Sequence, residues 1–222
     1  GTLQVTPDGQ SPTNYTLTNY SGNWGYTNLS MPDNRYTAKF MINDTGGTMN
    51  NTESVTFTVD TTVPVVVNAS VNDTTVFAAQ QVQVNISVTD ANRDDSTVKA
   101  SGDAGATNVS MALISGSAEV FQAETTSSAL GCPADGACTI TFFASDAAGN
   151  LNGSVTTAIT VDGTAPEVTI TSPSAGNTSS QTINFNATVL ENNPETSGTL
   201  QVTPDGQSPT NYTLTNYSGN WG

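Results

Sequence analysis

Histidine is absent from this chain of 222 residues, and basic side chains are scarce. Without histidine the chain lacks the usual general base near neutral pH and the commonest metal ligand of proteins. Four basic residues stand against nineteen acidic ones, so the formal net charge is −15; the basic residues are Arg35, Lys39, Arg93 and Lys99. A surface of this charge repels the phosphates of nucleic acids and anionic membranes. We therefore expect no nucleic-acid partner.

Long apolar runs are also missing. No apolar run of about eighteen residues occurs, and the first residues lack the charged, apolar and small pattern of a signal peptide. No stretch keeps a helical period of apolar residues. We expect no membrane insertion in this segment. Because the chain does not begin with Met, we also expect the true N-terminus to lie outside it.

Serine and threonine are abundant, but nothing in the sequence would activate them. A hydroxyl nucleophile needs a neighbouring base, and the chain has no histidine and no suitably placed lysine. The carboxylates stand in turn sequences, without an apolar pocket that would raise the pKa of one of them, as glycoside hydrolysis requires. We expect no enzymatic activity and no catalytic residues.

Cysteine is limited to Cys132 and Cys138, six residues apart in "GCPADGAC". The proline and the Asp-Gly pair between them favour a turn, so the two thiols can meet. Closing so small a loop would stabilise the fold by about 2 kcal/mol. The alternatives are two free thiols or a metal-binding pair, for which the chain has no second Cys or His pair. We predict a disulfide, which indicates a location outside the cytoplasm.

The first 25 and the last 25 residues of the chain are identical. "GTLQVTPDGQSPTNYTLTNYSGNWG" occupies residues 1–25 and recurs unchanged at 198–222, which gives a period of 198 − 1 = 197 residues. This period is too long for a short solenoid repeat and suits one or two ordinary domains. We interpret the chain as one period plus an overlap, and we expect the natural sequence to continue "YTNLSMPDNRYTAKF" after Gly222.

A second, diverged repeat lies inside the first. "FTVDTTVPVV" around Asp60 matches "ITVDGTAPEV" around Asp162 at an offset of 162 − 60 = 102 residues. The same offset aligns "MPDNRYTAKFMINDTGG" with "PADGACTITFFASDAAG". The predicted domains are therefore 1–60, the C-terminal part of a domain A; 61–162, a complete domain B; and 163–222, the N-terminal part of the next copy of domain A.

Alternating apolar residues, separated by turn sequences such as "PDG" and "DAAGN", predict β-strands. The expected inward-facing sets are Val82, Val84, Ile86 and Val88; Ile183, Phe185, Ala187 and Val189; Tyr36, Ala38, Phe40 and Ile42; and Val55, Phe57 and Val59. About seven strands fit in each unit, which is typical of an all-β sandwich of two antiparallel sheets.

Both units resemble a known family. "MPDNRYTAKFMINDTGGT", and more closely "ADGACTITFFASDAAGN" followed by "VDGTAPEVTI", are similar to the last two strands and the linker of bacterial and archaeal immunoglobulin-like (Big-type) domains, which occur in tandem on large cell-surface or filament proteins. Cys138 stands where the other unit has Tyr36, and the Cys-Trp-Cys signature of antibody domains is absent. The resemblance covers nearly the whole chain. It implies tandem immunoglobulin-like sandwiches of about seven antiparallel strands that serve as spacer, adhesion or assembly modules.

Asn-X-Ser/Thr sequons are more frequent than the composition predicts. Fourteen of the twenty-three asparagines stand in sequons, whereas chance would supply about six. They are Asn14, Asn19, Asn28, Asn43, Asn50, Asn68, Asn72, Asn85, Asn108, Asn152, Asn177, Asn186, Asn211 and Asn216. We interpret them as sites of N-linked glycans, the alternative being a polar surface with unused sequons. Strand alternation predicts that Asn14, Asn85, Asn108 and Asn186 face solvent, and leaves the register of Asn68 open.

Two further groups of residues suggest binding. Carboxylates near the domain junctions would suit Ca²⁺, although their spacing is not that of an EF-hand and we favour solvated carboxylates; they are Asp60, Asp90, Asp94, Asp95, Asp146 and Asp162. Aromatic residues around "NYSGNWGY" would offer a stacking surface for cell-surface glycans; they are Trp24, Trp221, Tyr15, Tyr20, Tyr26, Tyr212 and Tyr217. Alternation predicts that Tyr15 and Tyr212 belong to the core instead, and the others are more typical of packing at the end of a sandwich.

The sequence thus favours a structural role. We expect a subunit or repeat segment of an extracellular glycosylated fibre, stalk or surface layer, with the chain itself as the main partner and no required cofactor. One alternative is the spacer of a cell-surface adhesin that presents a terminal binding domain. Another is a filament subunit that donates strands, in which residues 1–25 and 198–222 compete to complete residues 26–60.

Overall fold

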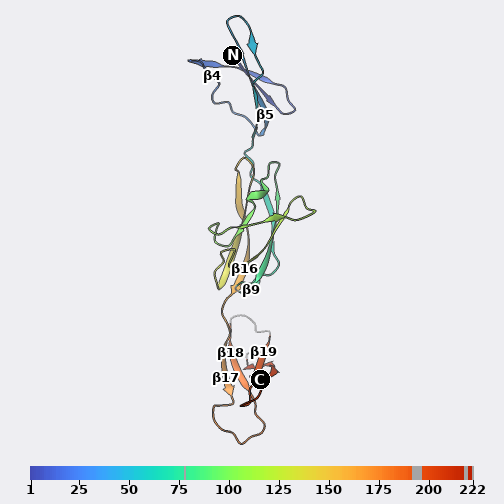
Figure 1. The fold of residues 1–222 in the computed structure, drawn as a ribbon, viewed down its shortest axis with the longest axis vertical. Helices are drawn as coiled ribbons and strands as arrows, with labels where there is room; N and C mark the ends of the chain where they lie inside the picture. The colour runs from blue at the N-terminus through green and yellow to red at the C-terminus, as the bar shows by residue number, and fades with distance from the viewer. Residues whose placement is uncertain (78, 192–196, 218–219, 222) are drawn as a thin grey trace.

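The computed structural model describes residues 1–77, 79–191, 197–217 and 220–221. In these residues the chain is all-β, and its one helical turn is the 3₁₀ helix η1 (Asp95–Thr97). The strands form three separate bodies that follow one another along an elongated molecule (Figure 1). No helix in the described part of the chain is long and apolar enough to cross a membrane.

The middle body consists of two sheets. One has the strand order β13-β14-β10-β8, with β8 (Val65–Val71), β10 (Gln81–Thr89), β13 (Ala112–Leu113) and β14 (Val120–Thr126). The other has the order β12-β11-β15-β16-β9, with β9 (Thr75–Phe77), β11 (Lys99–Ser101), β12 (Val109–Ser110), β15 (Gly136–Ser145) and β16 (Leu151–Asp162). All pairs are antiparallel except that of β9 with β16.

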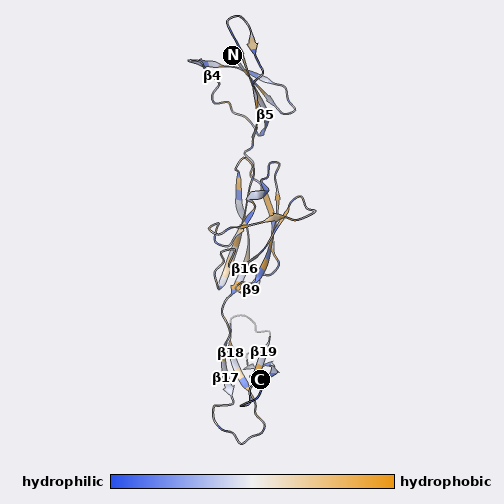
Figure 2. Cartoon of the chain, viewed as in Figure 1, coloured by the Kyte–Doolittle hydropathy of each residue, from blue (hydrophilic) through white to orange (hydrophobic). Residues whose placement is uncertain are grey.

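Both sheets contribute to one closed core in the middle body. Ile86 and Phe121 from the first sheet, and Ile140 and Phe142 from the second, are at most 1% exposed and belong to the same cluster. The predicted inward set of β10 is confirmed, because its four alternating residues are all buried. Figure 2 shows the apolar residues along these strands.

The N-terminal body has one main sheet. Its strands are β1 (Thr2–Pro7), β2 (Thr13–Thr16), β5 (Asn34–Asn43), β6 (Met49–Asn50) and β7 (Ser54–Val59), in the order β2-β1-β5-β6 with β7 also paired to β5. A separate hairpin joins β3 (Thr18–Tyr20) to β4 (Asn23–Gly25). The core is small and contains Leu3, Val5, Leu17, Tyr36 and Ala38. Tyr36 stacks on Phe57 with ring centroids 5.7 Å apart.

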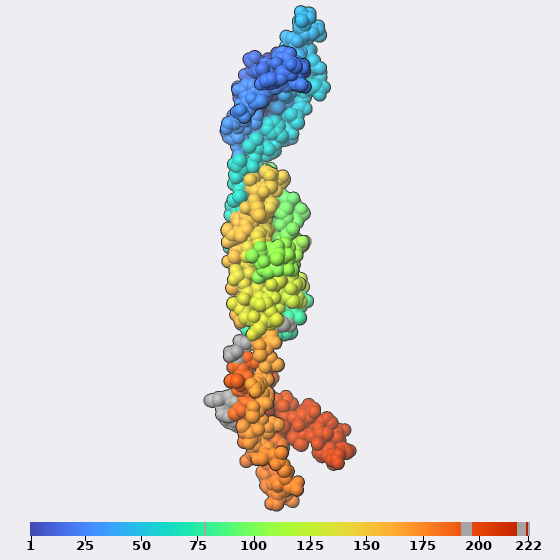
Figure 3. All heavy atoms as spheres, turned by 90° about the vertical axis from the view of Figure 1, so that its left-hand side faces the viewer, coloured from blue at the N-terminus to red at the C-terminus, as the bar shows by residue number. Residues whose placement is uncertain are grey.

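The C-terminal body is the least closed. β17 (Glu167–Ser172), β18 (Asn186–Leu190), β22 (Asn220–Trp221) and β21 (Asn216–Tyr217) form one sheet in that order, and β19 (Gly198–Val202) pairs with β20 (Thr210–Leu214) in a hairpin. This hairpin projects sideways from the long axis as the red arm in Figure 3. Among the described residues of this body, Trp221 is the one buried hydrophobic side chain.

Several predicted core positions in the end bodies are wrong. Phe40 is 38% exposed, Val55 54% and Tyr212 53%. Ile183 and Phe185, predicted to lie in a strand, precede β18. The physical reason is shared: alternation puts these side chains on an apolar face, but within the described residues no second complete sheet covers that face.

Candidate functional site

The repeated segment adopts the same local structure in both copies. Leu3 lies opposite Tyr15, and Leu200 lies opposite Tyr212, so the hairpins β1–β2 and β19–β20 share one register. The second hairpins agree as well, since Asn19 pairs with Trp24 in β3–β4 and the equivalent residues of β21–β22 pair likewise. The side-chain bond from glutamine Nε2 to asparagine Oδ1 measures 3.1 Å in both copies. Local sequence therefore determines these hairpins.

The surroundings of the two copies differ. In the first copy β1 also pairs with β5, whereas in the second copy β22 also pairs with β18. Trp24 is 37% exposed, but Trp221 is 5% exposed because β18 lies beside it. The pair of Ala187 with Trp221 corresponds to that of Ile86 with Phe121 in the middle body. The same 25-residue segment therefore takes part in a different sheet in each end body: its first strand pairs with β5 in the N-terminal body, and its last strand pairs with β18 in the C-terminal body.

The linker between the first two bodies is held by asparagines of the middle body. Asn150 Nδ2 donates to the backbone carbonyl of Asp60 at 3.0 Å, and Asn152 Nδ2 donates to that of Pro64 at 2.9 Å. Asn92 Nδ2 donates to Asp60 Oδ2 at 2.7 Å. Sequence reasoning missed these three asparagines as a group, because only their positions in the fold bring them to one linker.

The N-terminal body holds the same linker through Asp33. Its carboxylate accepts hydrogen bonds from Thr61 N at 3.1 Å, Thr61 Oγ1 at 2.9 Å and Thr62 Oγ1 at 3.0 Å. The pKa of Asp33 is lowered most by the hydrogen bond from the backbone amide of Thr61, and next by the bond from the Thr61 hydroxyl. Asp135 takes the equivalent place at the second junction, where it accepts from Gly163 N at 3.2 Å. Both junctions therefore use one aspartate to hold the start of the next body.

Three carboxylates converge beside the first linker. One oxygen from each of Asp60, Asp90 and Asp146 lies within 4.8 Å of the others. Burial acts to raise the pKa of Asp146, but hydrogen bonds from Asn150 and from the following backbone amides outweigh it and lower the pKa. Ca²⁺ would suit these oxygens. Each carboxylate also accepts hydrogen bonds from neighbouring amides. Asp146 is buried, so the prediction of solvated carboxylates is wrong for this residue.

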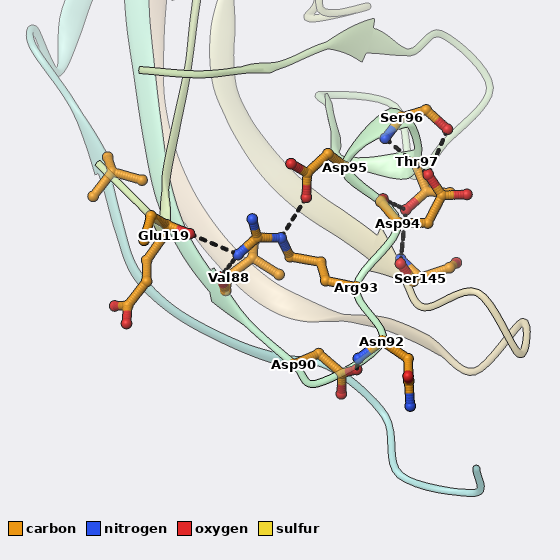
Figure 4. A network of polar contacts seen from close by, with 12 residues as sticks. Val88, Asp90, Asn92, Arg93, Asp94, Asp95, Ser96, Thr97, Glu119 and Ser145 are labelled. Carbon is orange, nitrogen blue, oxygen red and sulfur yellow. Dashed lines mark hydrogen bonds and ion pairs between the residues drawn. The ribbon is translucent and has the colours of Figure 1, made fainter. Parts of the chain in front are cut away.

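The other acidic candidates lie apart from this cluster. Asp94 caps η1 by accepting from Ser96 N at 3.0 Å, and Asp95 forms an ion pair with Arg93 (Figure 4). Asp162 ends β16 at the opposite end of the middle body, beside the second junction. Of the six acids that the sequence proposed, the structure brings three together.

Arg93 connects three parts of the middle body. Its Nη1 donates to the backbone carbonyls of Val88 at 2.8 Å and Ala118 at 2.9 Å. Its guanidinium lies 5.0 Å from the centroid of the Phe121 ring. Figure 4 shows this side chain between the end of β10 and the loop before β14. In the sequence Arg93 was noted only as one of the four basic residues. Its position between the acids of "TDANRDDS" is the local feature that could have indicated these contacts.

A disulfide joins Cys132, which precedes β15, to Cys138, which lies within β15. Gly102 lies against it, because a Cβ at this glycine would be 2.7 Å from each sulfur. Cys138 is buried, as Tyr36 is at the equivalent place of the N-terminal body. The bridge and the tyrosine ring therefore fill corresponding positions by different means.

Most sequon asparagines lie on the surface. Twelve of the fourteen are exposed, including Asn68, which has a φ of 59°. Asn85 and Asn152 are half-buried. Asn85 lies on the outer face of β10, where its Oδ1 accepts from Gln122 Nε2 at 3.0 Å. Asn152 and Asn108 donate through Nδ2, the atom that carries an N-linked glycan, to the backbone carbonyls of Pro64 and Gly105, so a glycan would replace one hydrogen of each of these donors.

The aromatic candidates do not form a single surface. Tyr15 and Tyr26 pack together with ring centroids 5.0 Å apart, and Tyr20 is 54% exposed. Trp221 lies in the core of the other end body. The side chain of Tyr217 falls outside the described part of the structure. This scatter does not support a sugar-stacking site built from both copies.

No family model and no curated protein matches the chain. Among solved structures, the chain is similar to a chimeric titin Z1Z2 functionalized with a KLER exogenous peptide from decorin, with 18% identity, coverage of 72% of this chain and 78% of that chain, and a TM-score of 0.26. At this TM-score the similarity carries no argument about function.

Proposed function

We propose that this chain is a repeating structural segment of an extracellular, glycosylated fibre, stalk or surface layer built from tandem immunoglobulin-like domains. Residues 61–162 form one complete domain, and residues 163–222 and 1–60 are the two parts of a second kind of domain. In this role the chain needs neither a cofactor nor a catalytic residue. Its main partner is another stretch of the same repeat.

The observation that carries the proposal is the pair of sheets around the repeated segment. The N-terminal body has the order β2-β1-β5-β7, and the C-terminal body has the order β21-β22-β18-β17. The middle body contains both arrangements, as β12-β11-β15-β16 and β13-β14-β10-β8. Joined through their shared segment, the two end bodies would reproduce the strand order of the middle body.

This strand order supports the immunoglobulin-like interpretation. A constant-type immunoglobulin domain has strands A, B, E and D in one sheet and C, F and G in the other. In the middle body β8, β10, β14 and β13 would be A, B, E and D, while β11, β15 and β16 would be C, F and G. The agreement covers seven strands, as the sequence resemblance implies.

The elongated arrangement and the linkers support a structural role. The bodies follow one another along the long axis in both Figure 1 and Figure 3. Hydrogen bonds from Asn92, Asn150 and Asn152 hold the first linker, which limits bending between the bodies. The disulfide and the twelve exposed sequons are consistent with secretion and glycosylation.

Labelling of intact cells tests the proposal. Antibodies raised against the whole chain, detected by immunogold in cryo-electron tomography, should mark extended surface structures at a repeat spacing of about 70–80 Å. Glycopeptide mass spectrometry should find glycans on the exposed sequons. Label confined to a stalk below a distinct terminal domain would favour the adhesin spacer instead, and label that appears only after permeabilisation would refute an extracellular role.

A further inference from the structure

The sequence contains a single Asn-Gly pair, Asn152–Gly153, which lies in β16 of the middle body. Its asparagine holds the first linker, because Asn152 Nδ2 donates to the backbone carbonyl of Pro64 at 2.9 Å. In such a pair the glycine nitrogen can attack the side-chain carbonyl carbon of the asparagine and close a succinimide ring. Glycine hinders this closure least, since it has no Cβ and reaches backbone conformations that other residues avoid.

A bulge in β16 contains this glycine. Between Phe142 and Ala144 the register of β15 with β16 shifts, so that Gly153 and Ser154 together lie opposite Phe143. Bulges of this kind interrupt the regular ladder of hydrogen bonds. Gly153 is exposed to solvent, and a Cβ on it would lie 2.8 Å from the Phe143 ring. The local fold therefore requires a glycine after the asparagine and gives water access to it.

The residue after the glycine polarises the asparagine side chain. Asn152 Oδ1 accepts hydrogen bonds from Ser154 N at 3.0 Å and from Ser154 Oγ at 2.9 Å. Attack on Cγ develops negative charge on this same oxygen, and donors already aimed at such an oxygen stabilise the transition state. The amide is also held from its Nδ2 end by the linker, so little rotational freedom is lost when the ring closes.

We propose that Asn152 is a site of spontaneous deamidation in the folded chain. The backbone nitrogen of Gly153 forms a bond to Asn152 Cγ, and the bond from Cγ to Nδ2 breaks. Nδ2 leaves as ammonia with the proton that the Gly153 amide gives up. Water then opens the succinimide: its hydroxyl group adds to one of the two ring carbonyl carbons and its remaining hydrogen goes to the ring nitrogen, which gives aspartate or isoaspartate. Water is the only co-reactant.

The product loses a contact with the first linker. A carboxylate at this position has no hydrogen to donate to the Pro64 carbonyl, so this carbonyl loses its partner and faces another acceptor oxygen. The isoaspartate product also lengthens the backbone of β16 by one methylene group at the bulge. The reaction therefore loosens the contact between β16 and the start of β8 as the molecule ages.

Asn50 provides a matched comparison within the same chain. It lies at the equivalent position, since 152 − 50 = 102 residues, and its Oδ1 accepts from Thr52 N at 3.1 Å and from Thr52 Oγ1 at 3.0 Å. The residue that follows it is Asn51 instead of glycine. The two sites thus share the hydrogen bonds to Oδ1 and differ in the residue that supplies the attacking nitrogen.

Ageing of the whole chain, produced without N-glycans, tests the proposal. After incubation at mildly alkaline pH, peptide mass spectrometry should find aspartate and isoaspartate at Asn152, formed many times faster than at Asn50. The rate should rise with pH, because the attacking amide must lose its proton. Asn51→Gly should accelerate the reaction at Asn50 many-fold. Absence of isoaspartate at Asn152, or equal rates at the two sites of the parent chain, would overturn the proposal.

A synthetic peptide of residues 148–158 separates the effect of the fold from that of the sequence. We expect the folded chain to react at Asn152 at least as fast as this peptide. Ser154→Ala should slow the reaction several-fold in the folded chain and much less in the peptide, because the hydroxyl is held against Oδ1 by the fold. A folded chain that reacts many times more slowly than the peptide would show that the fold protects Asn152, and would overturn the proposal.

Hydrogen exchange tests the effect on the linker. Asn152→Asp should raise the exchange rate of the amides at the start of β8 several-fold, whereas Asn50→Asp should leave it unchanged. Equal exchange in the two variants would overturn the proposed loosening. The proposal does not depend on an extracellular location, so it can fail independently of the cell-labelling test. A glycan on Asn152 Nδ2 in the protein from its natural source would block the reaction and would also overturn it.

Discussion

The middle body and the end bodies share one repeat pattern, yet only the middle body closes its core. Phe142 is 1% exposed while the equivalent Phe40 is 38% exposed, and Val66 is 5% exposed while the equivalent Val168 is 60% exposed. In the middle body each inward side chain faces a second sheet. Alternation along a strand decides which face is apolar, and the opposite sheet decides whether that face is buried.

The largest expected difference in stability is between alanine substitutions at the equivalent residues Phe142 and Phe40. Phe142→Ala removes a fully buried ring and should destabilise the middle body by about 3–5 kcal/mol. Phe40→Ala removes a ring that is 38% exposed and should cost about 1 kcal/mol in its own body. Hydrogen exchange followed by mass spectrometry resolves the two bodies. Equal costs at the two positions would contradict the view that only the middle core is closed.

Removal of the disulfide should have the second largest effect on stability. Replacing both Cys132 and Cys138 by Ser should destabilise the middle body by about 2 kcal/mol, since the unfolded chain regains the entropy of a small loop. The end bodies contain no cysteine and should keep their stability. Trp24 and Trp221 lie only in the end bodies, so urea unfolding followed by fluorescence should stay unchanged while circular dichroism shifts. A shift in fluorescence would indicate coupling between the bodies.

The first junction can be loosened at a single asparagine. Asn150→Ala removes the bonds to the Asp60 carbonyl and to Asp146 Oδ2, and should cost about 1–2 kcal/mol. Small-angle X-ray scattering should show a broader distribution of molecular lengths. Asn108→Ala, which also removes an amide-to-carbonyl bond but lies away from the junction, is the control. An unchanged scattering curve for Asn150→Ala would mean that other contacts hold the linker.

Acid should weaken the middle body through Asp103. Hydrogen bonds from Thr107, and then from Ser101, lower the pKa of Asp103 from 3.8 to about 2. A carboxyl whose pKa is lower in the folded state stabilises the fold above its unfolded pKa, and loses this contribution as the pH falls through the folded value. The urea midpoint of the middle body should therefore fall between about pH 4 and about pH 2. Asp103→Asn should flatten this dependence, and an unchanged slope would reject the assignment.

Calcium should have the smallest effect. Because the carboxylates of Asp60, Asp90 and Asp146 already accept hydrogen bonds, we expect millimolar Ca²⁺ to leave the unfolding temperature of the parent unchanged. Asp90→Asn serves as the comparison, since it removes one charge from the cluster. A rise in the unfolding temperature with Ca²⁺ that Asp90→Asn abolishes would show that the first junction is a calcium site.

The sequence by itself predicted the all-β class and the inward face of β10. Both are local properties, because strand alternation and turn residues act over a few neighbours. The two copies of the repeated segment also show that local sequence is sufficient, since they form hairpins with the same register in different surroundings. The candidate junction was predicted less well: three of the six acids converge, and the asparagines that hold the linker were missed.

Tertiary structure decided which apolar faces are covered and which polar groups meet. Phe40, Val55 and Tyr212 carry the expected alternation but remain exposed, because burial depends on a sheet distant in sequence. Trp24 and Trp221 occupy equivalent positions of one sequence, and only the second is buried, because only it lies beside β18. Alternation is set by covalent geometry along the strand, whereas burial is set by which strands come together.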